Sequence, residues 1–179
     1  HIDKKKLNIL DIGCGNGEQL LYWYDNIKQL PGKEVDNKDV DNNNVPHIKI
    51  TGLDINKDNL INCNNLINTH KLSKNIDVIH GDACNLPFKN DLYDSVLSLE
   101  SAFHYNSRPL FFKEVYKVLK KDGVFIIADI TRNKKNILTE YITYLASICM
   151  GYPYSNSESK DEWVHNLKLA GFNVEINDI

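Results

Sequence analysis

The stretch LNILDIGCGNGE, residues 7–18, decides the fold of this chain. An apolar run ends in Asp11, and glycine then occupies three alternate positions, which are Gly13, Gly15 and Gly17. After the glycines, residues 19–30 place their apolar side chains at helical spacing. A strand, a glycine turn and a helix in this order predict a ligand-binding turn, because a residue without Cβ adopts positive φ and admits a ligand close to the backbone. The first N–H groups of the helix are then free to bind that ligand.

The spacing of the glycines narrows the class of ligand. A dinucleotide fingerprint reads G-x-G-x-x-G, whereas the third glycine here follows the second after a single residue. A P-loop requires Lys and then Ser or Thr directly after its last glycine, and this chain has Glu18 and Gln19 there. The Glu18 carboxylate would also repel a phosphate at the start of the helix. The loop therefore favours a ligand without phosphate.

The loop sequence LDIGCGNG, residues 10–17, resembles the first motif of the class I S-adenosylmethionine-dependent methyltransferases. The resemblance implies that S-adenosyl-L-methionine is the cofactor and that S-adenosyl-L-homocysteine is the product. It also implies that four residues of the loop contact the cofactor, namely Asp11, Gly13, Cys14 and Gly15.

A second strand, predicted over His47–Leu53, ends in Asp54. A carboxylate at this point offers two acceptor oxygens to the two hydroxyls of a ribose. The resemblance accordingly assigns Asp54 and its neighbour Ile55 to the cofactor site. The alternative role for Asp54 is N-cap of the next helix, for which Asn56 competes. The polar segment 31–47 is interpreted as a low-complexity insertion, which explains the long spacing between the glycine loop and Asp54.

A third strand, predicted over Ile76–His80, is followed by the sequence GDA. This tripeptide is a common turn and is weak evidence when it stands alone. After the first two motifs, the resemblance implies that Asp82 accepts a hydrogen bond from the adenine amino group. It also implies that the backbone N–H beside it, at Ala83, meets the adenine ring.

The fourth strand, predicted over Leu92–Leu99, reads as a buried parallel strand. Its end lies at the carboxyl edge of the predicted sheet, where open α/β folds bind their ligands, and Leu99 is assigned to the cofactor. The candidate catalytic residues follow it, namely Glu100, His104 and Tyr105. His104 is the preferred general base, because histidine titrates near neutral pH, and packing or orienting the substrate is its alternative role. For Glu100 the alternative is a contact with the methionine part of the cofactor.

The remainder of the chain completes the expected fold. A helix opening at Ser107 is predicted to end near Lys120, Lys121 and Gly123, and the next strand covers 123–130. The apolar segment 137–150 is predicted to be a helix that either covers a substrate pocket or packs in the core. A helix over 161–169 and a strand over 172–176 follow. The family's sheet ends in an antiparallel hairpin, of which only this first strand is present.

The predicted fold class is therefore α/β, a Rossmann-like doubly wound and mostly parallel sheet in the class I methyltransferase order, with an incomplete C-terminal hairpin. Residues 1–179 are expected to form a single methyltransferase domain, in which 131–170 is the variable substrate or lid region.

Composition excludes several other functions. A formal net charge of -3 gives no broad positive surface for nucleic acid. The four cysteines lie far apart without a CxxC pair, so neither a zinc site nor a disulfide framework is indicated, and a reducing, cytoplasmic setting is expected. No metal-ligand cluster and no apolar run long enough to span a membrane are visible.

The segment from Tyr93 to Asp129 resembles the small-molecule methyltransferases that include ubiquinone-biosynthesis and sterol enzymes. The expected activity is methyl transfer to an O, N or C atom of a small molecule or lipid-like metabolite. The alternatives are a methyltransferase-like domain that binds cofactor without turnover and, less favoured by the glycine spacing, a NAD(P)-linked oxidoreductase. A protein or tRNA acceptor is disfavoured, because LESA replaces the N-P-P-Y-type signature after the fourth strand.

Overall fold

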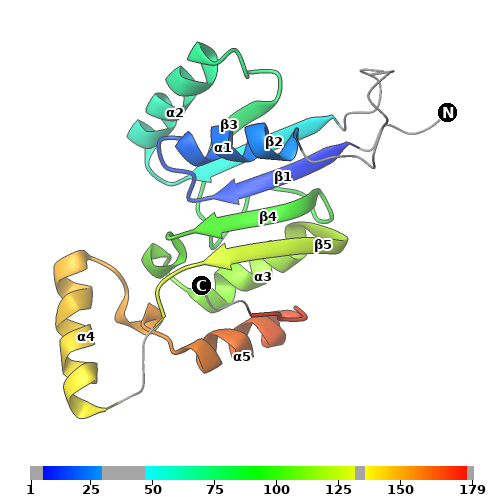
Figure 1. The fold of residues 1–179 in the computed structure, drawn as a ribbon. Helices are drawn as coiled ribbons and strands as arrows, with labels where there is room; N and C mark the ends of the chain where they lie inside the picture. The colour runs from blue at the N-terminus through cyan, green and yellow to red at the C-terminus, as the bar shows by residue number, and fades with distance from the viewer. Residues whose placement is uncertain (1–5, 30–46, 132–135, 177–179) are drawn as a thin grey trace.

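A computed structural model describes residues 6–29, 47–131 and 136–176. The predicted insertion at 31–47 lies outside the described residues except for His47. The structure contains a five-stranded sheet with the order β3-β2-β1-β4-β5 (Figure 1). Its strands are β1 (Leu7–Ile12), β2 (Ile48–Asp54), β3 (Ile76–His80), β4 (Tyr93–Leu99) and β5 (Leu119–Ala128).

Each neighbouring pair of strands in the sheet is parallel. The chain builds outward from β1 to β3 and then returns to place β4 and β5 on the other side of β1. Such a reversal of direction leaves a crevice at the carboxyl ends of the two strands where it occurs, here β1 and β4. The predicted α/β fold is confirmed, and the glycine loop lies at this crevice because it directly follows β1.

Helices cover both faces of the sheet. The α-helices are α1 (Glu18–Ile27), α2 (Lys57–Thr69), α3 (Arg108–Val118), α4 (Ile137–Met150) and α5 (Lys160–Ala170), and the short 3₁₀ helices are η1 (Ala102–His104) and η2 (Tyr154–Asn156). Ile9 belongs to the core cluster that includes buried residues of α1 and α2, whereas Leu10 belongs to the cluster that includes those of α3 and α5. Successive side chains of a strand point to opposite faces, so the sheet has a core on each side.

The prediction of a strand over 172–176 is wrong, because these residues form no strand in the structure. Phe172 and Val174 pack against the core cluster of α3 and α5, which accounts for their alternating apolar pattern. A strand also needs a ladder partner, and within the described ranges β5 pairs only with β4. The outer edge of β5 is exposed, with Val124 and Ile126 about half accessible to solvent.

The predicted boundary between the third α-helix and the fifth strand is also wrong. The helix ends at Val118 and β5 begins at Leu119, so residues 120–122 belong to the strand and not to the helix end. Leu119 is buried and pairs with Tyr93. Lys120 donates a 2.8 Å hydrogen bond to Asp94 on the neighbouring strand. The basic residues Lys120 and Lys121 suggested a helix C-terminus, but these contacts with β4 place them in a strand.

Helix α4 stands apart from the sheet (Figure 1). Its 14 residues bury only Ser147, and most of its large apolar side chains are exposed. The side chain of Ile137 is 91% exposed, and that of Ile148 is 61% exposed. Of the two roles left open for this helix, packing in the core is therefore wrong within the described residues. None of the helices in those residues has the length and apolar character needed to cross a bilayer.

Candidate functional site

The glycine loop between β1 and α1 forms the base of the candidate site. Gly13 has a φ of +80°, and a Cβ at this position would lie 2.5 Å from the Cβ of Ser101, so no other residue fits without displacing the chain. Gly15 has a φ of +54°, and a Cβ built there would meet no atom within 4 Å. The backbone at Gly15 is therefore open to an approaching ligand, as the sequence predicts for the loop.

Asp54 links the tip of β2 to the glycine loop. One carboxylate oxygen accepts a 2.9 Å hydrogen bond from the backbone N–H of Gly15, and the other accepts a 2.7 Å bond from that of Asn56. The N-cap of α2 is Asn56, whose side chain accepts from the N–H of Asp58, so Asp54 is free of the capping role. Each carboxylate oxygen has a second lone pair, which leaves acceptor capacity for a diol. Ile55 beside it is 66% exposed.

Asp11 is fully buried near the carboxyl end of β1. Neither of its carboxylate oxygens has a hydrogen-bond partner in the part of the chain that the structure describes. Burial raises the pKa of this carboxyl to about 7, and the side chain of Gln19 opposes the increase only in part. An unpaired buried carboxylate is costly, so this site favours either a proton or a cationic ligand.

Cys14 contributes backbone to the loop, while its side chain lies in the core. Its Sγ lies so close to the backbone of β2 that a Cβ on Gly52 would come within 2.8 Å of it. A hydrogen bond with the thiol of Cys63 and burial both raise the pKa of Cys14, which keeps this thiol protonated. The predicted contact with cofactor at Cys14 is therefore restricted to its main chain.

Asp82 and Ala83 follow β3 at the same edge of the sheet. One carboxylate oxygen of Asp82 accepts a 2.8 Å hydrogen bond from the backbone N–H of Cys84, which fixes the turn. Asp82 is partly exposed and Ala83 is buried. Because β2 and β3 are parallel neighbours, the side chains of Asp54 and Asp82 follow adjacent strands at one end of the sheet.

The turn after β4 contacts the glycine loop directly. Leu99 is half-buried at the end of the strand, and Glu100 is exposed with a φ of +47°. The hydroxyl of Tyr105 lies 3.1 Å from the carbonyl oxygen of Ile12 and 2.9 Å from Oγ of Ser101. Burial raises the pKa of Tyr105, so the phenol stays protonated near neutral pH and is suited to hold the turn.

His104 occupies the exposed side of the same turn. Its backbone N–H donates a 3.1 Å hydrogen bond to the carbonyl of Ser101, and its ring centroid lies 4.0 Å from that of Phe103. His104 is thus exposed, while its backbone N–H is hydrogen-bonded within the turn. Of the three candidate catalytic side chains, Glu100 and His104 are exposed and Tyr105 is bonded into the loop.

Sequence reasoning missed three buried polar residues behind this turn, namely Arg108, Asp129 and Asn156. An arginine in the first turn of a helix normally indicates solvent exposure, yet the Arg108 side chain is fully buried. Of the three, Asp129 could have been found from the sequence, because it directly follows an apolar strand at the carboxyl edge of the sheet, where ligand-binding residues are expected. Asn156 gave no signal, since it lies in a polar segment that reads as a loop.

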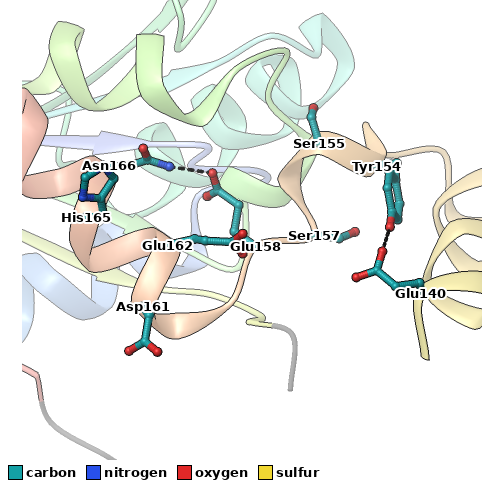
Figure 2. Close-up of a pocket in the computed structure, with 9 residues that line it drawn as sticks. All are labelled: Glu140, Tyr154, Ser155, Ser157, Glu158, Asp161, Glu162, His165 and Asn166. Carbon is teal, nitrogen blue, oxygen red and sulfur yellow. Dashed lines mark hydrogen bonds between the residues drawn. The ribbon is translucent and has the colours of Figure 1, made fainter. Parts of the chain in front are cut away.

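Two surface hollows are lined by none of the predicted site residues. One, of about 560 Å³, lies between α4, η2 and α5 (Figure 2) and is lined by Glu140, Tyr154, Ser155, Ser157, Glu158, Asp161, Glu162, His165 and Asn166. The other, of about 910 Å³, follows the open edge of β5. In the described part of the chain no group of three or more His, Cys, Asp or Glu side chains is placed to hold a metal ion.

Comparison with known proteins places this arrangement in a family. A family model described as a methyltransferase domain matches residues 3–171. Erythromycin 3''-O-methyltransferase of Saccharopolyspora erythraea is 28% identical over 178 residues, which cover 96% of this chain and 52% of the relative. Sterol 24-C-methyltransferase of Candida albicans is 25% identical over 175 residues, which cover 96% of this chain and 41% of the relative. The chain thus spans about half of these relatives or less.

A solved structure shares the fold. Phosphoethanolamine N-methyltransferase 2 of Haemonchus contortus, in complex with S-adenosyl-L-methionine, matches with a TM-score of 0.71 and 17% identity. The match covers 95% of this chain and 34% of that one. At this identity the likeness concerns the fold alone.

Proposed function

The chain belongs to the class I S-adenosylmethionine-dependent methyltransferases, and from that premise we propose that it binds S-adenosyl-L-methionine and methylates an O, N or C atom of an apolar small molecule. One observation carries the proposal. Asp54 at the tip of β2 holds the N–H of Gly15, at a loop whose backbone is open on the ligand side. This arrangement brings a diol acceptor and an open main chain to the same place.

The residues around the loop fit the chemical groups of this cofactor. The spare lone pairs of Asp54 suit a ribose diol, and Asp82 at the end of the neighbouring strand suits an amino group of adenine. Ile55, Ala83 and Leu99 offer apolar side chains around them. The unpaired Asp11 carboxyl suits a cationic ligand, because a nearby positive charge lowers its pKa and favours the ionised form.

When bound, S-adenosyl-L-methionine supplies a methyl group activated by its sulfonium. The protein then has to orient an acceptor and exclude water, which is a task of alignment. His104 is the proposed general base for a hydroxyl or ammonium acceptor, because its ring is accessible at the carboxyl edge of the sheet. Tyr105 would instead keep the turn against the glycine loop, with its proton retained.

An apolar acceptor is supported by two observations. The relatives named above are methyltransferases of erythromycin and of sterols. Helix α4, in the region between β5 and α5, carries exposed Leu138, Tyr141 and Ile142. An apolar patch of this kind on a protein surface often marks a binding site.

Ligand-dependent stability tests the cofactor. Thermal unfolding is measured with S-adenosyl-L-homocysteine and separately with NADH, and only the first is expected to stabilise the protein. Saturation at about 100 times Kd adds about 2.7 kcal/mol. Stabilisation by NADH alone would contradict the proposal.

A pair of glycine variants locates the site. Gly15→Ala is compared with Gly151→Ala, because both glycines have positive φ and would carry a Cβ in open space. Both variants are expected to lose a similar stability of about 1–2 kcal/mol. Only Gly15→Ala is expected to lose affinity for S-adenosyl-L-homocysteine, measured by calorimetry. Equal affinities in the two variants would remove the glycine loop from the site.

Methyl transfer itself separates the enzyme from a cofactor-binding domain without turnover. The protein is incubated with S-adenosyl-L-methionine labelled on the methyl group and with a sterol, a long-chain fatty acid and a macrolide. Labelled methyl groups in an extracted product would support methyltransferase activity. Tight binding of S-adenosyl-L-homocysteine with no labelled product from any acceptor would favour the domain without turnover.

A further inference from the structure

The turn of residues 101–105 is held from two opposite sides. On one side it meets the glycine loop, since Oγ of Ser101 and the hydroxyl of Tyr105 both lie within hydrogen-bond distance of the carbonyl oxygen of Ile12. On the other side it meets the C-terminal part of the chain, which is far away in sequence. The turn thus sits between the proposed cofactor site and the region that follows β5.

Asn156 of η2 makes the C-terminal contact. Its side-chain amide donates a 3.0 Å hydrogen bond to the carbonyl of Phe103 and a second hydrogen bond to the carbonyl of Tyr105. These two carbonyls flank His104 in the chain. The Asn156 residue is 2% exposed, so water does not easily replace its amide.

Asp129 completes the hold on the turn. After the end of β5, one of its carboxylate oxygens accepts a 2.9 Å hydrogen bond from the backbone N–H of Phe103, and the other accepts from the N–H of Ile130. The main chain at Phe103 therefore has its N–H and its carbonyl bound by two buried side chains, one directly after β5 and one in η2.

Arg108 joins these two residues. Its guanidinium donates to the backbone carbonyl of Asn156 and lies 3.8 Å from a carboxylate oxygen of Asp129. It also lies 3.6 Å from Glu158 and 4.6 Å from the ring centroid of Trp163. A guanidinium is planar and permanently charged, so it is suited to bind several acceptors while it stacks on an aromatic ring. Arg108 thus fixes where Asn156 and Asp129 meet the turn.

We propose that Asn156, held in place by Arg108, is a positioning residue that sets the main chain around His104 against the glycine loop. It acts on the turn through the two carbonyls that flank His104, and Asp129 acts through the N–H of Phe103. The assignment of His104 to the acceptor side rests on the proposed function. Loss of the amide is expected to displace the imidazole while the cofactor loop, which Asn156 does not touch, keeps its affinity.

The test observes His104 by NMR, without any acceptor. The chain has six histidines, so labelling them at Cε1 gives a small set of signals, and the His104→Gln variant identifies the one that belongs to His104. Asn156→Asp replaces the donating amide by a group that repels both carbonyls. Its His104 signal is expected to shift or broaden in the ligand-free protein, while the His80 signal stays in place.

Asn75→Asp is the matched control. Asn75 also donates its side-chain amide to a backbone carbonyl, in this case that of Ile48 at 3.1 Å. The substitution makes the same chemical change at a residue whose amide bonds to β2 and not to the turn. It is expected to lower the melting temperature without moving the His104 signal. A displacement of the signal in both variants would show general loosening of the protein and would overturn the proposal.

Asn156→Ser provides a second variant that buries no charge, in case Asn156→Asp does not fold. It keeps the backbone carbonyl that accepts from Arg108. Its shorter side chain has no amide to donate to the carbonyls of Phe103 and Tyr105. A folded variant of either kind with an unchanged His104 signal would refute the positioning role.

Binding and turnover add a separate readout. Each variant is titrated with S-adenosyl-L-homocysteine, and labelled methyl transfer is measured with the acceptor that the wild type accepts. Asn156→Asp is expected to lower kcat roughly tenfold or more, with KM for S-adenosyl-L-methionine changed less than about twofold. If the wild type itself neither binds the product nor transfers methyl, the proposed function fails, and the ligand-free comparison of the two Asp variants still decides the role of Asn156.

Discussion

Helices α2 and α4 have similar lengths and opposite relations to the rest of the molecule. Helix α2 is rich in asparagine, yet it buries Leu60, Cys63 and Ile67 against the sheet. Helix α4 carries a single charged residue, Glu140, and buries only Ser147. The more apolar helix is therefore the less buried one. Burial is decided by what lies opposite a helix face, and for α4 nothing in the described part of the chain covers that face.

The contrast extends to the two halves of the candidate site. The cofactor half is built from the connections that follow β1, β2 and β3, and a hydrogen bond from the backbone N–H of Gly15 to the side-chain carboxylate of Asp54 joins two of them. The acceptor half depends on contacts between the turn after β4 and the distant residues Asp129 and Asn156. We expect mutations to separate these halves clearly, because the first lies at the ends of neighbouring parallel strands and the second depends on contacts with residues outside the sheet.

The largest expected effect is on the buried side of α2. Ile67 is 2% exposed, so Ile67→Ala removes apolar contacts and leaves a cavity. The free energy of unfolding is expected to fall by about 2–5 kcal/mol, measured by urea denaturation. A cost below about 1 kcal/mol would mean that α2 is not packed as the structure describes.

The pH dependence of stability tests Asp11. The pKa of its carboxyl rises from 3.8 to about 7 on folding, so the folded state holds more protons between these pH values. The free energy of unfolding should therefore fall as the pH rises through this window, by at most about 4 kcal/mol from this group. Urea unfolding at about pH 4.5 and about pH 7.5 measures the change.

Asp11→Asn is the comparison that isolates this group. Burial also raises the pKa values of Asp129 and Glu158, so the wild-type slope contains their contributions with the same sign. Only the difference in slope between wild type and variant belongs to Asp11. Parallel slopes in the two proteins would show that Asp11 is ionised in the folded state at all pH values tested.

Asp54→Ala tests the cofactor half directly. The substitution removes the acceptor for the N–H of Gly15 together with the proposed acceptor for ribose. Affinity for S-adenosyl-L-homocysteine is expected to fall by about 1.5–3 kcal/mol, or roughly 10- to 150-fold, measured by calorimetry. Asp58→Ala removes an exposed carboxylate from the first turn of α2 and should leave the affinity unchanged. Equal affinity in both variants would take Asp54 out of the ribose site.

The smallest expected effect is on the exposed side of α4. Ile148→Ala makes the same change as Ile67→Ala, but at a side chain that is 61% exposed. The free energy of unfolding is expected to change by about 0.5 kcal/mol or less in urea. A cost similar to that of Ile67→Ala would mean that α4 packs against a surface, and the contrast between the two helices would then disappear.

Much of the cofactor half could be predicted from the sequence. The glycine loop, the strand that ends in Asp54 and the turn at Asp82 are local patterns, and the structure places all three at one end of a parallel sheet. The roles of these residues toward a cofactor stay predictions. The predicted strand over 172–176 failed because an alternating pattern describes a face that is buried and says nothing of a ladder partner.

By itself, the sequence determined the order of strands and helices as far as α5, the glycine loop and the acidic residues at the ends of β2 and β3, because periodicity and turn chemistry act over a few neighbouring residues. Only the tertiary structure decided that Arg108 is buried, that the Asp11 carboxylate meets no hydrogen-bond partner among the described residues and that Asn156 binds the carbonyls beside His104. These properties depend on which distant segments meet. Asn156 and Phe103 are 53 residues apart in the chain, and no local pattern in either segment encodes their contact.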